Sequence, residues 1–347
     1  MSYSCSEKLW KPIIRPPRHY YQLKDLGNQI QMVMDTVTKR TDFEIVNKRK
    51  LTLQCSLFEP VRVQDRQHSC MIYLHGNSSS RVEALTILEY LIPYNIAVCG
   101  IDLSGSGHSE GVYISLGYYE SQDVQSLIDY LRDHKPYITQ IGLWGRSMGS
   151  VTAILSASHN EDIKVLVCDS PFSNLTLLCK EIATSGYGVP GCCFNCFFCF
   201  VKSKIRKEAK FNIDDLNIIQ IIGSNFLNLQ ILDLSSQVSI AFLSANQDQL
   251  IHSKHTKQLH CFFKGTKLLK SFDGHHNSKR PNDVMKEVAD FAISQLGKQQ
   301  SDQPQSSRDT KLLLLRNQRE KISFQYDEVH PIMTGGQISN NEQNITK

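Results

Sequence analysis

The chain contains no long hydrophobic run and no large excess of charge of either sign. Its longest apolar stretch, Cys192–Val201, has ten residues and is interrupted by Asn195, whereas a membrane-spanning helix needs about 20. The 347 residues carry 38 Lys and Arg against 34 Asp and Glu, a formal net charge of +4. A charge this small, balanced along most of the chain, argues against nucleic acid as a partner.

The N-terminus also lacks the marks of export or lipid attachment. No apolar segment of signal-peptide length follows the first charged residues, and position 2 is Ser2 rather than the glycine that N-myristoylation requires. Eleven cysteines in 347 residues fall well below the ~8–10% that is typical of a short disulfide-stabilised secreted chain. We therefore expect a cytoplasmic protein with free thiols.

The composition divides the chain into three zones. We interpret residues 1–30 as an N-terminal arm, 31–296 as the folded domain and 297–347, which is rich in Gln, Ser, Asn and Asp, as a disordered tail. Predicted strands cover 51–57, 69–74, 96–103, 140–144, 163–168, 239–244 and 267–271. Predicted helices cover 80–92, 119–134, 148–158, 253–260 and 282–296. This alternation is typical of a mostly parallel α/β sheet flanked by helices, and the interval 172–235, too long for a crossover, is interpreted as an inserted cap.

A candidate nucleophile lies in the segment Gly145-Arg-Ser147-Met-Gly149, between a predicted strand and a predicted helix. Glycines two residues to either side of a serine permit the very tight turn that projects its hydroxyl. The start of a helix also favours a developing oxyanion. We therefore predict that Ser147 is a catalytic nucleophile.

A nucleophilic serine needs a base and an acid that orients the base, and in folds with this turn the chain order is serine, acid, histidine. Asp248 is the one carboxylate between Asp233 and Asp273 and follows a predicted strand, so it is the predicted acid. Asp169 is the rival, although capping of the following turn is the simpler role for it. The segment after the last strand offers two candidate bases, His275 and His276.

The oxyanion hole requires two backbone amides. We predict that Met148, the residue after the nucleophile, donates one. His75-Gly-Asn77 follows an apolar strand, and Asn77 is the predicted second donor.

Two other segments invite a functional interpretation that we consider weaker. The glycines of Asp102–Gly111 lack the spacing of a nucleotide-binding loop, so we expect a tight surface loop beside the active site. His252 and His255 lie three residues apart, but with no carboxylate or third ligand nearby we interpret them as solvated side chains rather than a metal site.

Four motifs occur in the right order: strand-HGN, D-x-S-G-x-G-x-S-x-G, G-R-S-M-G and G-x-H-N-S-x-R-P. Together they resemble the α/β-hydrolase superfamily, and in particular the serine-aminopeptidase-like hydrolases of protists and plants that are related to the depalmitoylases. The resemblance covers about residues 10–296. It implies an α/β-hydrolase fold with an inserted helical cap, a triad of Ser147, Asp248 and His276, and oxyanion amides near Asn77 and Met148. The chain departs from the family at the cysteine-rich segment 192–199 and in surplus residues at about 221–232.

The cysteine-rich segment admits three interpretations. The spacing of Cys193, Cys196 and Cys199 resembles part of an iron–sulfur pattern, although a fourth ligand followed by proline is missing. S-acylation or peripheral membrane contact through 192–210 is the second, since five basic residues follow at 202–210. The third is simple packing of Cys192 and its neighbours as small hydrophobic side chains in an apolar cap helix.

These features lead to one principal functional hypothesis. We predict a serine hydrolase that cleaves an acyl ester, thioester or amide through an acyl-enzyme, with a small-molecule or lipid acyl substrate and with neither a cofactor nor a metal. The alternatives are a non-catalytic binding protein of the same fold and an acyltransferase that uses the same triad.

Overall fold

The computed structural model describes residues 7, 10–63, 66–186, 188, 190–223, 234 and 238–297. Within these ranges, the side chains of residues 186, 191–193 and 196 are not described. The predicted tail, apart from Gly297, and most of the surplus segment at 221–232 therefore lie outside the described residues. The described part belongs to one compact unit, Met1–Gln299.

The seven predicted strands are confirmed within a few residues at each end. They are β3 (Thr52–Pro60), β4 (His68–Leu74), β5 (Ile96–Ile101), β6 (Ile138–Arg146), β7 (Ile163–Asp169), β8 (Ser239–Ala245) and β9 (Lys267–Phe272). Two further strands, β1 (Ile30–Val33) and β2 (Thr36–Val46), were not predicted. Their sequences mix polar and apolar residues because they lie at the antiparallel edge of the sheet, where less of the strand is buried.

The strands form one sheet in the order β1-β2-β3-β5-β4-β6-β7-β8-β9. The pairs β1–β2, β2–β3 and β3–β5 are antiparallel. The pairs β5–β4, β4–β6, β6–β7, β7–β8 and β8–β9 are parallel. The register aligns Leu74 with Gly145, and Gly145 with Cys168. The carboxyl ends of β4, β6 and β7 therefore meet at one edge, and the loops that follow them share one place in the molecule.

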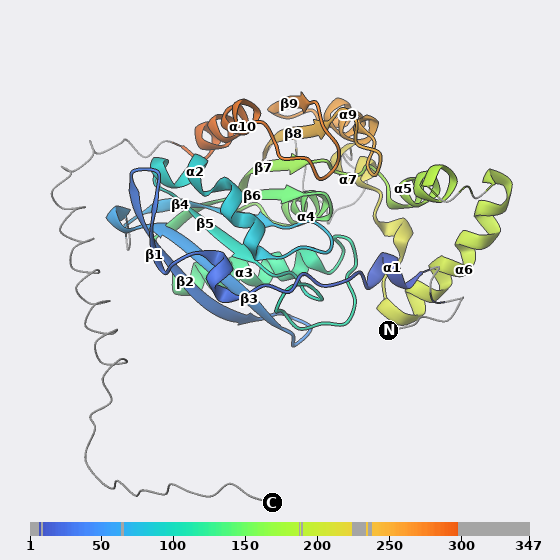
Figure 1. The fold of residues 1–347 in the computed structure, drawn as a ribbon, viewed down its shortest axis with the longest axis horizontal. Helices are drawn as coiled ribbons and strands as arrows, with labels where there is room; N and C mark the ends of the chain where they lie inside the picture. Colours follow the sequence, from blue (N-terminus) through green and yellow to red (C-terminus); the bar gives the residue numbers. More distant parts are fainter. Residues whose placement is uncertain are drawn as a thin grey trace, which may run out of the picture. The chain divides into compact units, whose positions relative to one another are not determined.

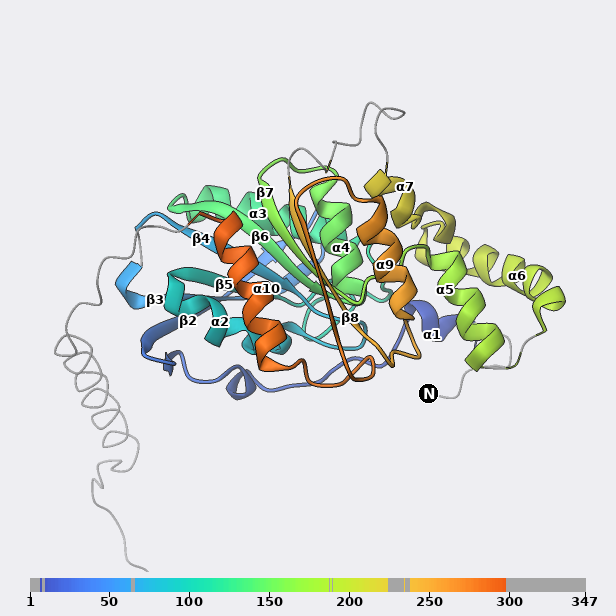
Figure 2. The ribbon, with the colours of Figure 1, turned by 90° about the horizontal axis from the view of Figure 1, so that it is seen from above.

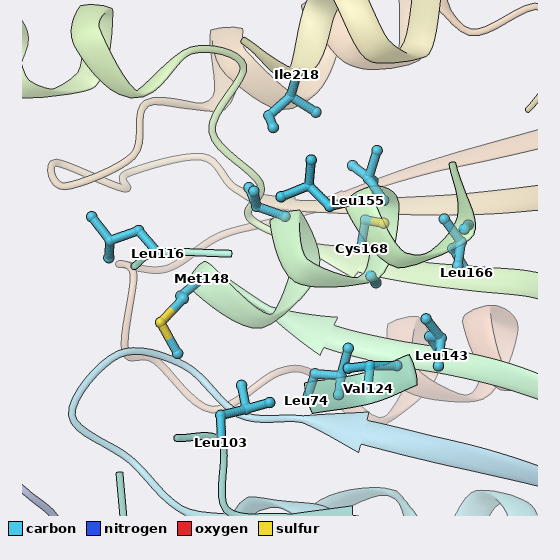
Figure 3. Close-up of a cluster of buried hydrophobic side chains, with 14 of the residues drawn as sticks. Leu74, Leu103, Leu116, Val124, Leu143, Met148, Leu155, Leu166, Cys168 and Ile218 are labelled. Carbon is cyan, nitrogen blue, oxygen red and sulfur yellow. The ribbon is translucent and has the colours of Figure 1, made fainter. Parts of the chain in front are cut away.

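Helices cover both faces of the sheet. The segment 80–92 begins as the 3-10 helix η4 (Arg81–Ile87) and continues as α2 (Leu88–Leu91) and η5 (Ile92–Tyr94). The other predicted helices are α3 (Glu120–His134), α4 (Met148–Ala157), α9 (Ser253–Phe262) and α10 (Asn282–Gln295). Apolar side chains of α2 and α10 join one buried cluster, whereas those of α3, α4 and α9 join the other. In this second cluster Leu74 and Leu143 of the sheet lie near Val124 of α3 (Figure 3).

The described part of the interval between β7 and β8 is largely helical. It holds α5 (Leu175–Glu181), the π-helical turn η6 (Ile182–Gly186), α6 (Gly191–Ala209), η7 (Ile213–Asp215) and α7 (Ile218–Gly223). Both views place α5 and α6 beyond one end of the sheet, toward which the arrows of β6 and β7 point (Figure 1, Figure 2). The short helix α1 (Lys11–Ile14) of the N-terminal segment packs against α6. We refer to α5 and α6 as the cap helices.

Candidate active site

Ser147 lies on the turn between β6 and α4. Its backbone has φ 53° and ψ −114°, a strained conformation for a residue other than glycine. The amide of Ser147 donates to the carbonyl of Asp169 at 2.7 Å, which ties the turn to the end of the neighbouring strand. Only 8% of Ser147 is exposed, and it lines a cavity.

The two glycines of this motif permit the close approach of backbone segments. A Cβ atom on Gly145 would lie 2.1 Å from the carbonyl oxygen of Gly149, and one on Gly149 would lie 2.0 Å from that of Leu74. Neither position can hold a larger residue unless the backbone moves. The spacing of glycines around Ser147 is therefore a packing requirement of the crossing between β4, β6 and α4.

Asp248 and His276 form a buried pair near the same edge of the sheet. His276 Nδ1 lies 2.6 Å from Asp248 Oδ2, and the other carboxylate oxygen accepts hydrogen bonds from the amides of Leu250 and Ile251 at 2.9 and 2.8 Å. Burial opposes ionisation of Asp248, but the hydrogen bond and charge of His276 and the two amides outweigh it, so its pKa lies below the usual value. Asp248 is thus held as an anion that orients the imidazole.

The neighbouring histidine occupies a different environment. His275 is exposed, its Nδ1 lies 2.9 Å from the carbonyl oxygen of Gln247, and its amide donates to Ser278 Oγ. Of the two candidate bases left open by the motif, His276 is the one beside Asp248. Among the described residues, Ser147 Oγ has no hydrogen bond to either histidine, and active-site bonds of this kind often tighten only when substrate binds.

The two predicted oxyanion donors lie beside Ser147. Met148 is the first residue of α4, so its amide has no acceptor within the helix. Asn77, Ser147 and Met148 line the same cavity. A Cβ atom on Gly76 would lie 3.9 Å from Ser147 Cβ, so the loop that carries Asn77 passes directly along Ser147.

Arg146 connects three parts of the site, a role that sequence analysis did not identify. Its guanidinium pairs with Glu83 at 3.1 Å and donates to the carbonyl of His276 at 3.1 Å and to Asn277 Oδ1 at 2.7 Å. Glu83 in turn accepts from the amide of Gly76 at 3.2 Å. The side chain next to Ser147 thus holds both the loop that carries Asn77 and the loop that carries His276.

Asp169 does more than cap the turn that follows it. It accepts from Ser170 Oγ at 3.0 Å, and it also forms a two-point ion pair with Arg280 at 2.7 and 2.9 Å. Arg280 further donates to the carbonyls of His276 and Ser278 at 2.9 and 2.6 Å. Since the Asp169 carbonyl accepts from the amide of Ser147, this ion pair links the turn that carries Ser147 to the loop that carries His276. In the sequence, Arg280 is part of the last motif, but nothing there indicated that it pairs with Asp169.

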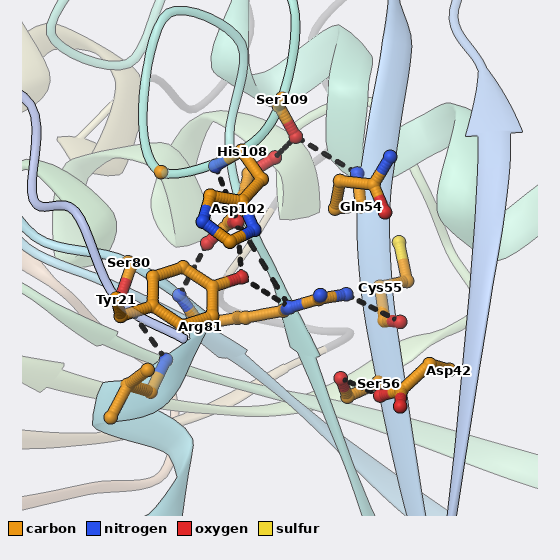
Figure 4. Close-up of polar contacts among 12 residues, drawn as sticks. Tyr21, Asp42, Gln54, Cys55, Ser56, Ser80, Arg81, Asp102, His108 and Ser109 are labelled. Carbon is orange, nitrogen blue, oxygen red and sulfur yellow. Dashed lines mark hydrogen bonds and ion pairs between the residues drawn. The ribbon is translucent and has the colours of Figure 1, made fainter. Parts of the chain in front are cut away.

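The segment Asp102–Gly111 is the tight loop that we expected, but most of it is buried rather than at the surface. Asp102 is buried and accepts hydrogen bonds from Tyr21 Oη at 2.7 Å and from the amides of Arg81 and His108 at 2.6 and 2.9 Å (Figure 4). A Cβ atom on Gly107 would lie 2.3 Å from the Asp102 carboxyl carbon. The glycine and serine residues of this motif are therefore part of a buried polar network that fixes the conformation of the loop.

The expectation that His255 is solvated is wrong. His255 is fully buried and lies 2.7 Å from Ser173 Oγ through Nδ1 and 2.9 Å from Glu181 Oε2 through Nε2. This contact joins α9 to the cap helix α5. Within the described ranges, no three His, Cys, Asp or Glu side chains are grouped so that they could hold a metal ion.

A cavity of about 480 Å³ adjoins Ser147. Its lining is mostly apolar and comes from α1, the loop before α3, α4, the segment after β7, the cap helices and the loop after β8. These side chains include Ile13, Leu116, Met148, Leu175, Leu178, Phe194, Phe198 and Ile251. A cavity of this size and lining suits the apolar part of a small ligand.

The cysteine-rich segment forms the first half of α6. The side chains of Cys192, Cys193 and Cys196, on which the iron–sulfur interpretation depends, lie outside the described residues. Cys199 is exposed, so packing against the core does not hold for this residue. None of the described helices is both long enough and apolar enough to cross a bilayer.

Comparisons with known proteins agree with this architecture. Residues 65–188 match the family of serine aminopeptidases of group S33. An uncharacterised protein of Bacillus subtilis (strain 168), YqkD, is 30% identical over 105 residues, which is 30% of this chain. The matched segment spans about a third of that relative, 34% of its length.

Solved structures are similar over most of the chain. An esterase of Pyrococcus furiosus, Pf2001, has a TM-score of 0.58 at 21% identity and covers 82% of this chain and 98% of its own. Est1E of Butyrivibrio proteoclasticus, solved with ferulic acid bound, has a TM-score of 0.52 at 17% identity and covers 73% and 98%. The protein therefore has the α/β-hydrolase fold, and the comparisons support a hydrolase type of function in general.

Proposed function

We propose that the protein is a serine hydrolase that cleaves esters or thioesters of apolar acyl groups. The observation that carries this proposal is the position of Ser147, on a strained turn at a helix N-terminus beside an apolar cavity. The buried Asp248–His276 pair near the same edge supports it. The esterase of Pyrococcus furiosus among the structural neighbours favours the same chemistry.

The reaction follows from the chemistry of these groups. Ser147 Oγ attacks the acyl carbonyl while His276 accepts its proton, and Asp248 keeps the imidazole in the tautomer with a proton on Nδ1. The amides of Met148 and Asn77 stabilise the negative charge on the carbonyl oxygen. His276 then returns the proton to the leaving alcohol or thiol. Water, activated by His276, releases the acyl group from Ser147 in the second half of the reaction.

The apolar cavity is suited to bind the acyl group of the substrate. Leu178 and Phe198 of the cap helices line it together with Leu116. Each methylene group transferred from water to such a surface contributes about 0.8 kcal/mol. A charged peptide would gain nothing from this lining, so an acyl chain is the better substrate class.

A second serine in the chain provides a matched control for the nucleophile. Ser173 also contacts a histidine, His255, that contacts a carboxylate, Glu181. Ser173 is fully buried and is absent from the cavity lining beside Ser147. A substrate therefore cannot reach its hydroxyl.

The test is labelling with a fluorophosphonate probe together with hydrolysis of p-nitrophenyl esters. Ser147→Ala should abolish labelling and lower turnover by about 10⁴–10⁶, whereas Ser173→Ala should retain both. Asp248→Asn should keep the fold but lower kcat by roughly 10⁴, because it favours the wrong tautomer of His276. Undiminished labelling of the Ser147→Ala variant would overturn the assignment.

A further inference from the structure

We propose that the outward face of α6 is a docking surface for an anionic lipid bilayer. The surface is defined by Cys199, Phe200, Lys204, Arg206 and Lys207. It goes beyond the proposed hydrolase function, because it concerns where the protein binds and not what Ser147 does.

The helix α6 has two distinct faces. Phe194, Phe198, Val201, Ile205 and Ala209 are buried, and their spacing of four, three, four and four residues keeps them on one side of the helix. Cys199, Phe200, Arg206 and Lys207 are exposed. Since the first set accounts for the packing of the helix, Cys199 and Phe200 are left at its outward surface.

Charge on the outward face is strongly positive. Five basic side chains, Lys202, Lys204, Arg206, Lys207 and Lys210, lie in nine residues that contain one acidic residue, Glu208. Lys202 is neutralised by Asp214 at 2.6 Å, whereas the structure gives Lys204, Arg206 and Lys207 no ion pair within the described residues. A cluster of this kind is complementary to the phosphates of anionic lipids.

Aromatic and basic groups are combined on this face. Phe200 is 39% exposed, and Lys204 Nζ lies 5.6 Å from the centre of its ring. A ring inserted at the level of the lipid headgroups, with a long basic side chain that reaches back to the phosphates, is typical of interfacial helices. Exposed phenylalanine favours a bilayer over a nucleic acid or an acidic protein as the occupant.

The position of α6 connects this face to the cavity. Phe194, Phe198 and Val201, which belong to the buried face of the same helix, line the cavity beside Ser147. A helix is about 10–12 Å in diameter with its side chains. A bilayer seated on the outward face would therefore lie about one helix diameter from the cavity.

The test is sedimentation of the full-length Ser147→Ala variant with vesicles of phosphatidylcholine alone or with 30% phosphatidylserine, at about 50 mM and 500 mM salt. Use of this variant separates binding from turnover, so failure of the hydrolase proposal would leave the result unaffected. Binding is expected with the anionic vesicles only, and weaker binding is expected at high salt.

Charge reversal locates the surface. Each basic residue near an anionic membrane strengthens binding by about fivefold, so loss of three should weaken binding by about 100-fold. Lys204→Glu, Arg206→Glu and Lys207→Glu together also add three negative charges and should weaken binding by at least that factor. The matched control reverses three exposed lysines elsewhere, Lys48, Lys164 and Lys286, and should bind nearly as the parent does. Thermal melting verifies that each variant folds. Equal affinity for both vesicles, or equal losses in the two triple variants, would overturn the proposal.

Discussion

Replacement of Arg280 by methionine should destabilise the protein by about 3–5 kcal/mol, because it leaves a buried carboxylate without its partner. Asp169 is 4% exposed and receives two hydrogen bonds from the Arg280 guanidinium, at 2.7 and 2.9 Å. Burial would lower the pKa of Arg280, but the Asp169 carboxylate more than compensates and raises it. The two charges are thus strongly coupled. For comparison, Lys270→Met breaks the more exposed pair with Glu287 and should cost about 0–1 kcal/mol.

A double-mutant cycle measured by urea denaturation tests this reasoning. Asp169→Asn removes the charge and keeps the shape, so Arg280→Met with Asp169→Asn should be less destabilised than the sum of the single variants, by about 2–3 kcal/mol. Turnover should not recover in the double variant, because the hydrogen bond from Arg280 to the carbonyl of His276 is still missing. Additive free energies of unfolding would refute the coupling, and recovered turnover would refute the positioning role.

Three further outcomes follow from the same geometry. Gly149→Ala places a methyl group 2.0 Å from the carbonyl oxygen of Leu74 and should lower the free energy of unfolding by at least about 2 kcal/mol. In the control Gly223→Ala the nearest neighbour of the new methyl group would be 3.6 Å away, so the free energy of unfolding should change by less than about 1 kcal/mol. Equal urea midpoints for the two variants would contradict this. Burial lowers the pKa of His255 below 6.5, despite the opposing contact with Glu181. Below pH 6.5 the unfolded chain therefore binds more protons at this residue than the folded protein does. As the pH is lowered, the stability of the protein should fall until the pH is below the pKa of His255 in the folded state. The thermal midpoint of His255→Gln should accordingly depend less on pH between 7 and 5 than that of the wild type, and identical slopes would show that His255 does not contribute. For p-nitrophenyl esters, kcat/KM should rise by about fourfold per methylene until the cavity is full, and Leu178→Trp should end that rise at a shorter chain; an unchanged chain-length profile would exclude this cavity as the acyl site.

Those features of the candidate site that depend on contiguous residues could be predicted. The strand, the turn and the helix around Ser147 are adjacent in the chain. The two glycines of the motif occupy the positions at which a Cβ atom would collide with the backbone. Asp248 could be selected because one carboxylate was present in the right interval. The choice between His275 and His276 rested on resemblance, since both follow the same strand and only the path of the loop distinguishes them.

Contacts between residues far apart in the chain could not be predicted. Arg280 and Asp169 are 111 positions apart, and Arg146 and Asn277 are 131 apart. These residues belong to the motifs, but no local sequence pattern indicates which distant residues they contact. The same is true of His255: its polar neighbours in sequence indicate a solvated side chain, but it is buried because α5 packs against it.

The sequence by itself determined the alternation of strands and helices, and with it a parallel sheet, because hydrophobic periodicity is a local property. It also determined the tight turn at Ser147, since Gly145 and Gly149 are needed there for steric reasons. Only the tertiary structure decided which groups meet at the carboxyl edge of that sheet and which face of α6 is left uncovered. These depend on register, loop paths and burial, which arise when distant segments pack together.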